Sequence, residues 1–232
     1  LCAPIRDAYR AGGARAFDAD LMARVYGRPF EVAVVSREKL PAEKASKSSV
    51  GGHLDGCRIG FDLGASDYKL AAVVDGNAVF STEIPWDPKN EPDPAYHYTK
   101  INAGLKLAAT HLPRVDAIGG SSAGIYIDNK VMAASLFRVV PLEKFESLVK
   151  PMFLNLQREW GAPLVVINDG DVTALAGAMS LGKNAMLGVA MGSSQAAGFM
   201  DRAGSLPGWL TELAFAPVDY NPAAPPDEWS GD

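Results

Sequence analysis

The sequence has 232 residues, of which 48% are hydrophobic and 21% charged, and this composition is typical of a globular protein with a sizeable core. Its net charge of -5 does not favour a nucleic-acid partner, and two cysteines, Cys2 and Cys57, are too few for a disulfide framework or a zinc site. No apolar run reaches the roughly eighteen residues of a membrane-spanning helix, so we expect no membrane partner. The cysteine usage favours a reducing cytoplasm.

Residues 1–56 are expected to form an N-terminal extension and a linker. The chain starts at Leu1 with neither Met nor a signal-peptide pattern, so we expect an incomplete reading frame. An amphipathic helix is predicted over Ala19–Tyr26, and a short strand over Phe30–Val35. The small, polar and Lys-bearing stretch Pro41–Gly52 is typical of a flexible linker with solvated lysines.

From Cys57 onward the pattern predicts regular elements in close succession. Three strands form a meander, and Asp75-Gly76-Asn77 between the second and the third is a hairpin signal. Helices and strands then alternate, and a last hairpin follows. The expected strands are Arg58–Leu63, Lys69–Val74, Ala78–Ile84, Val115–Ser121, Leu164–Ile167, Met186–Met191 and Gln195–Asp201. The expected helices are Ala95–His111, Leu142–Trp160 and Val172–Leu181.

This order indicates an α/β fold. A meander followed by alternating helices and strands gives a mixed sheet with helices on both faces. It is the order of a ribonuclease-H-like lobe, the building block of the actin, Hsp70 and sugar-kinase superfamily. We expect such a lobe over residues 57–184, and the beginning of a second, similar lobe over residues 185–232.

The first motif, Asp62-Leu63-Gly64-Ala65-Ser66, places a carboxylate at the end of an apolar strand. We expect Gly64 to turn the chain with positive φ, and the small residues after it to let backbone N–H groups approach an anion. Asp62 would be the acidic partner of a hydrated Mg2+ ion, and Lys69 would add positive charge. The alternative is a plain hairpin turn with an ordinary Asp.

The second motif, Asn168-Asp169-Gly170-Asp171, follows another buried strand. The carboxyl end of a parallel strand is where open α/β sheets bind ligands. Asp169 is the candidate base that takes a proton from a sugar hydroxyl, and Asn168 would fix the sugar by donating and accepting hydrogen bonds. Asp171 is interpreted as the N-cap of the helix that follows.

Three further stretches combine small residues with polar ones. Gly188–Gly198 offers backbone and hydroxyl donors at a hairpin tip, and Gly119–Asp128 offers backbone on which a sugar ring can lie. Gly204–Phe215 places Glu212, a candidate for bridging sugar hydroxyls, near Trp209, a candidate for packing on a ring. The alternatives are a hairpin turn, a tight loop, and a solvated Glu beside a core Trp.

In this order the motifs resemble the ROK family (repressor, open reading frame, kinase) of bacterial sugar kinases and sugar-responsive regulators. The resemblance covers residues 57–215 and implies an incomplete member of the family. It implies that Asp169 is the catalytic base, and Ala123-Gly124 with Asp128 look like the family's sugar-side loop. The implied phosphate contacts are Asp62, also the metal position, Gly64, Ser66, Lys69, Gly192, Ser193 and Ser194. The implied sugar contacts are Ala123, Gly124, Asn168, Asp169 and Glu212.

The activity implied by the resemblance is ATP-dependent phosphorylation of a hexose or amino-sugar hydroxyl. Its cofactors would be ATP and Mg2+, and its partner a small sugar. A homodimer is one possible assembly that the sequence leaves open. A non-catalytic sugar-sensing protein is the rival, because Phe215 stands where the family has a His and the segments that hold adenosine are missing. Fold alone does not choose between these functions.

Overall fold

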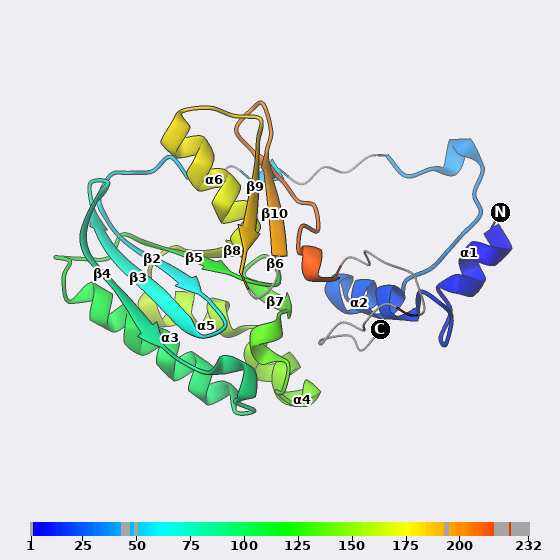
Figure 1. Ribbon diagram of the computed structural model, residues 1–232, viewed down its shortest axis with the longest axis horizontal. Coiled ribbons are helices and arrows are strands. Elements are labelled where there is room, and N and C mark those ends of the chain that lie inside the picture. The colour runs from blue at the N-terminus through cyan, green and yellow to red at the C-terminus, as the bar shows by residue number, and fades with distance from the viewer. Residues whose placement is uncertain (1, 43–46, 49–50, 193–194, 216–222, 224–232) are drawn as a thin grey trace. The chain divides into compact units, whose positions relative to one another are not determined.

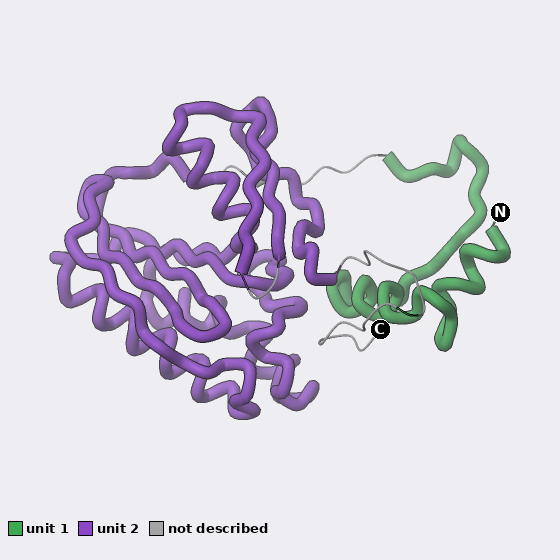
Figure 2. The backbone as a smooth tube through the Cα atoms, in the orientation of Figure 1, with its two compact units in different colours: residues 1–46, 217–232 green, residues 47–216 purple. Residues whose placement is uncertain are grey.

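The computed structural model describes residues 2–42, 47–48, 51–192, 195–215 and 223 (Figure 1). The chain divides into two compact units, residues 1–46 with 217–232 and residues 47–216, which we describe separately (Figure 2). In the described part, no helix is both long enough and apolar enough to cross a membrane. The domain boundaries expected after residues 56 and 184 stay predictions.

The first unit contains the helices α1 (Cys2–Ala8) and α2 (Ala16–Tyr26). The helix predicted to end at Tyr26 is confirmed. Its buried side chains include Leu21 and Val25, one turn apart on the same side of the helix. Gly27 ends α2 in the left-handed conformation, with a φ of 65° and its N–H donating to the carbonyl of Ala23.

The strand predicted over Phe30–Val35 is wrong, because the structure shows no regular element there. The side chains of Val34 and Val35 are 66% and 46% exposed. A β-strand is stabilised by a neighbour that takes its backbone hydrogen bonds and covers one face, and this segment has no such neighbour in the described residues. A short 3-10 turn, Arg37–Lys39, follows it.

The second unit is built on a five-stranded mixed sheet in the order β4-β3-β2-β5-β8 (Figure 1). The strand β2 pairs antiparallel with β3 and parallel with β5, and β5 pairs parallel with β8. The Asp75-Gly76 turn between β3 and β4 has φ values of 48° and 80°, as the hairpin signal predicts. The strands are β2 (Cys57–Leu63), β3 (Asp67–Val74), β4 (Asn77–Pro85), β5 (Ala117–Ser122) and β8 (Leu164–Asn168).

Helices cover the two faces of this sheet, as expected. The helices α3 (Pro94–Ala109) and α5 (Met152–Trp160) lie on one face, and α6 (Asp169–Leu181) lies on the other (Figure 1). Successive residues of β8 show the alternation: Val166 belongs to the large core, whereas Ile167 packs against the small cluster that contains Ala178 of α6.

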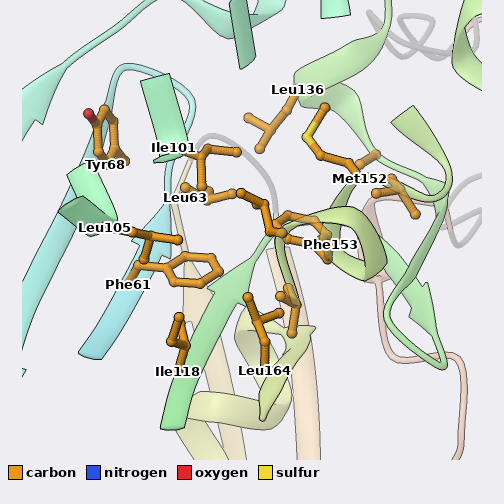
Figure 3. Packing of buried hydrophobic residues seen from close by; sticks show 14 of the residues in the cluster. Phe61, Leu63, Tyr68, Ile101, Leu105, Ile118, Leu136, Met152, Phe153 and Leu164 are labelled. Carbon is orange, nitrogen blue, oxygen red and sulfur yellow. The ribbon is translucent and has the colours of Figure 1, made fainter. Parts of the chain in front are cut away.

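The large core lies between the sheet and the helices α3 and α5, with Phe61, Leu105 and Phe153 near its centre (Figure 3). The rings of Phe61 and Phe153 stack with centroids 6.1 Å apart. Gly120 on β5 lies directly against Phe61: a Cβ atom there would come within 2.1 Å of the ring. Gly120 therefore makes room for the core and does not present backbone to a ligand.

The single helix predicted over Leu142–Trp160 is wrong, because the structure divides it. A short α4 (Leu142–Lys144) leads into a π-helical turn, Phe145–Val149, before α5 begins at Met152. Pro151 precedes α5 and has no N–H to donate, which interrupts a continuous helix. The wider turn still buries Phe145 and Val149 in the core.

The alternative of a tight loop over Gly119–Asp128 is wrong, because the stretch includes β6 (Ile125–Ile127), which pairs with β7 (Lys130–Ala133) in a β-hairpin. Its turn residues, Asp128 and Asn129, both have positive φ, at 50° and 59°. The Asn129 amide donates to the carbonyl of Leu164 at 2.6 Å and accepts from the N–H of Val166 at 2.9 Å. This side chain takes the place of a strand on the free edge of β8.

The hairpin predicted after α6 is confirmed as β9 (Met186–Met191) and β10 (Gln195–Met200). It packs closely on α6 through glycines. A Cβ atom at Gly188 would come within 2.2 Å of the Ala174 nitrogen, and one at Gly198 within 2.3 Å of the Gly170 carbonyl. The remaining elements are β1 (Lys47–Ser48), which pairs with β11 (Leu206–Pro207), and the 3-10 turns Pro88–Asn90, Ser135–Phe137 and Leu213–Phe215.

Candidate functional site

The three parallel strands β2, β5 and β8 end at one edge of the sheet. Asp62 lies opposite Ser121, and Ser122 lies opposite Asn168. Asp169 is the first residue of α6, directly after the end of β8. Strand register alone therefore brings the two acidic motifs to the same edge, although about a hundred residues separate them in the sequence.

The carboxylates of Asp62 and Asp169 are within electrostatic range of each other. Burial raises the pKa of Asp169 above its ordinary value, and the negative charge of Asp62 raises it further, while the N–H of Gly170 lowers it. Asp62 is half-buried and makes no hydrogen bond or ion pair within the described residues. Its charge also acts on Lys69, which lies opposite it in the β2–β3 register. Two carboxylates thus share one edge of the sheet.

The side-chain amide of Asn168 makes three hydrogen bonds within the protein. Its Oδ1 accepts from the N–H of Gly170 at 2.8 Å, which caps α6. Its Nδ2 donates to the carbonyl of Gly124 at 2.8 Å and to a carboxylate oxygen of Glu212 at 3.1 Å. These three contacts join β8, the loop after β5 and the segment after β11. Asn168 has no amide hydrogen left for a sugar.

The N-cap role predicted for Asp171 is wrong, because α6 begins two residues earlier and Asn168 caps it. Asp171 instead lies in the first turn of the helix, and burial raises its pKa to about 7, with a further contribution from the charge of Asp169. Its Oδ1 is buried without a hydrogen-bond donor within the described part of the chain. A buried carboxylate without donors favours its neutral form.

Glu212 connects the segment after β11 to the same edge. Its Oε2 accepts from the N–H of Gly124 at 2.6 Å, while its Oε1 is buried and has no donor among the described residues. The side chain is 7% exposed, so the alternative of a solvated Glu is wrong. Burial raises the pKa of Glu212, and the charge of Asp169 adds to this effect. Glu212 and Asp169 therefore lie close enough for their charges to act on each other.

Tyr126 of β6 is a neighbour that the sequence analysis missed. Its hydroxyl oxygen lies 2.7 Å from Oγ of Ser122 and 3.2 Å from the carbonyl of Ala123. Burial raises the pKa of the phenol, and the charges of Asp169 and Glu212 also act on it. The alternation Ile125-Tyr126-Ile127 is the signal that would have indicated a strand here.

The loop between β2 and β3 differs from the expectation at two points. Gly64 does not have positive φ; a Cβ atom there would instead come within 2.8 Å of the Asp67 carbonyl, to which the Gly64 N–H donates. Asp67 also accepts from Oγ of Ser66 at 2.9 Å and from Nζ of Lys69 at 2.8 Å. The hydrogen bond to Asp67 raises the pKa of Lys69, and its positive charge is balanced locally.

Some of the remaining predicted site residues lie outside the part of the chain that the structure describes. Gly192 is exposed and follows β9, whereas Ser193 and Ser194 lie outside the described residues. Trp209 is 62% exposed and stacks on Phe199 with ring centroids 5.8 Å apart, so the alternative of a core Trp is wrong. Among the described residues, no group of three or more His, Cys, Asp or Glu side chains forms a metal centre.

Comparison with known proteins gives a match only at the level of structure. No family model matches the sequence. No curated protein matches it either. Among solved structures, the chain is similar to the ROK hexokinase from Thermus thermophilus, with 17% identity, 68% of this chain and 51% of that chain covered, and a TM-score of 0.52.

Two other similar structures differ in what they do. The inorganic polyphosphate/ATP-glucomannokinase from Arthrobacter sp. strain KM is 21% identical over 68% of this chain and 63% of that chain, with a TM-score of 0.54. A ROK family transcriptional regulator, a homologue of the E. coli MLC protein, is 18% identical over 74% of this chain and 43% of that chain, with a TM-score of 0.56.

These likenesses show a shared fold. The predicted ribonuclease-H-like α/β architecture is confirmed, and the resemblance to ROK proteins is confirmed at the level of the fold. The chain spans 43% to 63% of the length of these proteins. Kinases and a regulator match alike, so the comparison does not choose between the two functions.

Proposed function

We propose that this chain belongs to a ROK-like sugar kinase that transfers a phosphoryl group from ATP to a sugar hydroxyl. The observation that carries the proposal is the position of Asp62 and Asp169 at one sheet edge, within range of each other's charge. In such a reaction one carboxylate receives a proton and another serves the phosphate side. Neither forms a salt bridge within the described residues, although the charge of Asp62 acts on Lys69, which lies opposite it in the β2–β3 register.

Asp169 is the proposed base. It follows β8 directly, so the strand and the first turn of α6 fix its backbone. The raised pKa of its carboxylate makes it a better proton acceptor than an exposed Asp. Asp169 would take the proton from the sugar hydroxyl as the oxygen attacks phosphorus, and hydrogen-bond contact with that hydroxyl is the requirement that the sugar's position must satisfy.

The proposed sugar contacts come from the segments that meet around Asn168. Glu212 offers its Oε1 as an acceptor, and the backbone of Ala123 and Gly124 lies beside it. Because its amide hydrogens are already donated, Asn168 would act mainly by holding Glu212 and Gly124 in place. Asp169 and Glu212 then face the same sugar.

The proposed phosphate contacts come from two parts of the sequence, the stretch from the end of β2 to the start of β3, and residues 192–194 after β9. The lone carboxylate of Asp62 fits a hydrated Mg2+ ion, since this ion keeps several waters and takes few protein carboxylates. When bound, ATP would supply the phosphoryl group and Mg2+ would neutralise part of its charge. The protein groups proposed to contact the phosphates are Gly64, Ser66, Lys69, Gly192, Ser193 and Ser194.

A coupled assay of ADP release over a panel of hexoses tests the kinase proposal. Asp169→Ala is expected to lower the sugar-dependent rate by about 10²–10⁴-fold, because it removes the general base. Sugar affinity, measured by calorimetry on the same preparation, should change little. Glu143→Gln, an exposed carboxylate on α4, is the matched control and should keep full activity. Unchanged turnover in Asp169→Ala rules out its assigned role.

A sugar sensor without kinase activity is the second candidate, favoured by the ion pair between Lys69 and Asp67. The pair places a carboxylate next to the cation that the kinase would use for phosphate. Asp67→Asn frees this cation and should tighten nucleotide binding in a kinase. Sugar-induced thermal stabilisation without any ADP release, in both the wild type and Asp67→Asn, would support the sensor instead.

A further inference from the structure

The strand β9 has one edge without a hydrogen-bonding partner. On the far side of β10, the N–H of Ala197 donates to the carbonyl of Thr211 at 2.9 Å, so the backbone of Ala197 faces away from β9. Val189 lies opposite Ala197, and two opposite residues of an antiparallel pair either bond to each other or both face outward. The backbone groups of Val189, and by alternation those of Leu187 and Met191, therefore point to the outer edge of β9. No described residue forms a hydrogen bond with them there.

The same residues of β9 expose apolar side chains. Leu187, Val189 and Met191 are 67%, 44% and 78% exposed. They lie on the face of the hairpin that is turned away from α6, because the alternate residue Gly188 packs directly against that helix. Phe199 lies opposite Leu187 in the register and extends this apolar face onto β10. One strand thus presents unpaired backbone groups and an apolar surface together.

Three other sheet edges in this unit are covered or protected. Asn129 binds backbone groups at the edge of β8, and residues 211–212 lie along the far edge of β10. The edge strand β4 contains Glu83 and ends at Pro85, and its pairing with β3 includes a register shift. Charges, prolines and bulges hinder pairing between sheet edges. The β9–β10 hairpin has no such protection: residues 185–200 contain no charged side chain and no proline, and the register is continuous.

We propose that β9 forms a dimer interface, in which its outer edge pairs antiparallel with the same edge of a second copy of this chain. With a two-fold axis at Val189, this residue lies opposite its own counterpart, and Leu187 lies opposite the counterpart of Met191. All three have outward-pointing backbone groups, so each finds a hydrogen-bonding partner. The two hairpins become one continuous sheet, with the apolar faces of both copies on the same side.

Charge and chain direction favour a second copy over other occupants of this edge. The chain has a net charge of -5, so two copies repel each other over much of their surface, and an uncharged strand is where they can approach. A basic partner would be matched by acidic side chains on β9, and the strand has none. The chain's own continuation through residue 212 runs along β10, on the opposite side of the hairpin. The dimer does not depend on the proposed kinase activity.

Light scattering of the whole chain at increasing concentration tests the proposal. The mass is expected to rise from that of one chain, 24.5 kDa, toward twice this value. Val189→Lys places two like charges opposite each other across the two-fold axis and should raise the dissociation constant of the dimer at least about tenfold. Val79→Lys, the same substitution at an exposed position of β4, is the matched control and should dimerise as the wild type does.

Amide hydrogen exchange of the wild type, followed by NMR, is a second test that does not require the variant to fold. The N–H groups of Leu187, Val189 and Met191 should exchange more slowly as the dimer forms. The N–H groups of the residues between them already face β10 and should change little.

A dimer that Val189→Lys weakens and that protects these edge amides supports the proposal. A dimer that the variant leaves intact, or exchange that does not change with concentration, overturns it. A chain that stays monomeric at every concentration also overturns it and leaves the edge to a different polypeptide. These outcomes are independent of sugar-dependent ADP release, which tests the proposed function separately.

Discussion

Two groups of carboxylates in the second unit are treated in opposite ways by the fold. Between α3 and α5, Glu159 accepts hydrogen bonds from the hydroxyl of Tyr98, the amide of Asn102 and the ammonium of Lys106, which lower its pKa to about 2. At the sheet edge, Asp171 has no donor for Oδ1, and burial raises its pKa to about 7.

The difference separates structural carboxylates from those available to a ligand. Glu159 connects two helices, and every partner that it needs comes from the protein. Asp171 and Glu212 retain acceptors that the described residues do not use. Unpaired buried groups of this kind cost stability, and they are common at functional sites.

The largest expected effect concerns Asp171. Its folded-state pKa of about 7 lies above the ordinary value of 3.8, so the folded protein binds the extra proton between these values and loses stability as pH rises through them. Asp171→Asn removes this loss. We expect the variant to exceed the wild type in unfolding free energy at pH 8, by up to about 4 kcal/mol, and to match it near pH 4. Urea unfolding across this pH range measures the difference, and parallel curves would contradict it.

A smaller effect, a loss of stability, is expected when Asn129 is replaced, because this side chain has a structural role. Asn129→Ala leaves the carbonyl of Leu164 and the N–H of Val166 without their partners at the edge of β8. We expect a destabilisation of about 1–3 kcal/mol, because both groups are partly buried. Sugar affinity of the folded fraction should stay the same. A drop in sugar affinity without a drop in stability would place Asn129 in the site and would contradict its structural role.

The smallest effect is expected at Glu159. Its lowered pKa means that it stabilises the fold above the unfolded-state value of 4.5 and that this contribution is lost as pH falls toward about 2. Glu159→Gln should therefore lower the melting temperature at neutral pH slightly and flatten the acid limb of the stability curve. The effect should be weaker in high salt, since the pair with Lys106 is partly exposed. A gain in stability would contradict the structural role.

The sequence predicts the sheet better than it predicts the site. The strands around Asp62 and Asp169 follow from apolar runs and from the Asp75-Gly76 turn, because these signals are local. Parallel pairing of these strands then brings their carboxyl ends, and the two acidic motifs, to one edge of the sheet. The order of the motifs in the sequence suggests this arrangement. The roles of these two residues in catalysis stay predictions.

The parts that sequence reasoning missed depend on contacts between distant segments. Glu212 meets Gly124 across 88 residues, and no spacing rule indicates this contact. The β6–β7 hairpin was overlooked because its strands are short and its turn, Asp128-Asn129, lacks glycine. Pro151 lies at the break before α5. The sequences on both sides of Pro151 have helical patterns, so the break was not predicted.

The central claim, that Asp62 and Asp169 share one site, is tested most directly by titrating the Asp169 carboxyl group with 13C NMR in the wild type and in Asp62→Asn. If the two side chains face each other, removal of the Asp62 charge must lower the pKa of Asp169 toward its ordinary value. An unchanged pKa in a correctly folded variant would contradict the claim.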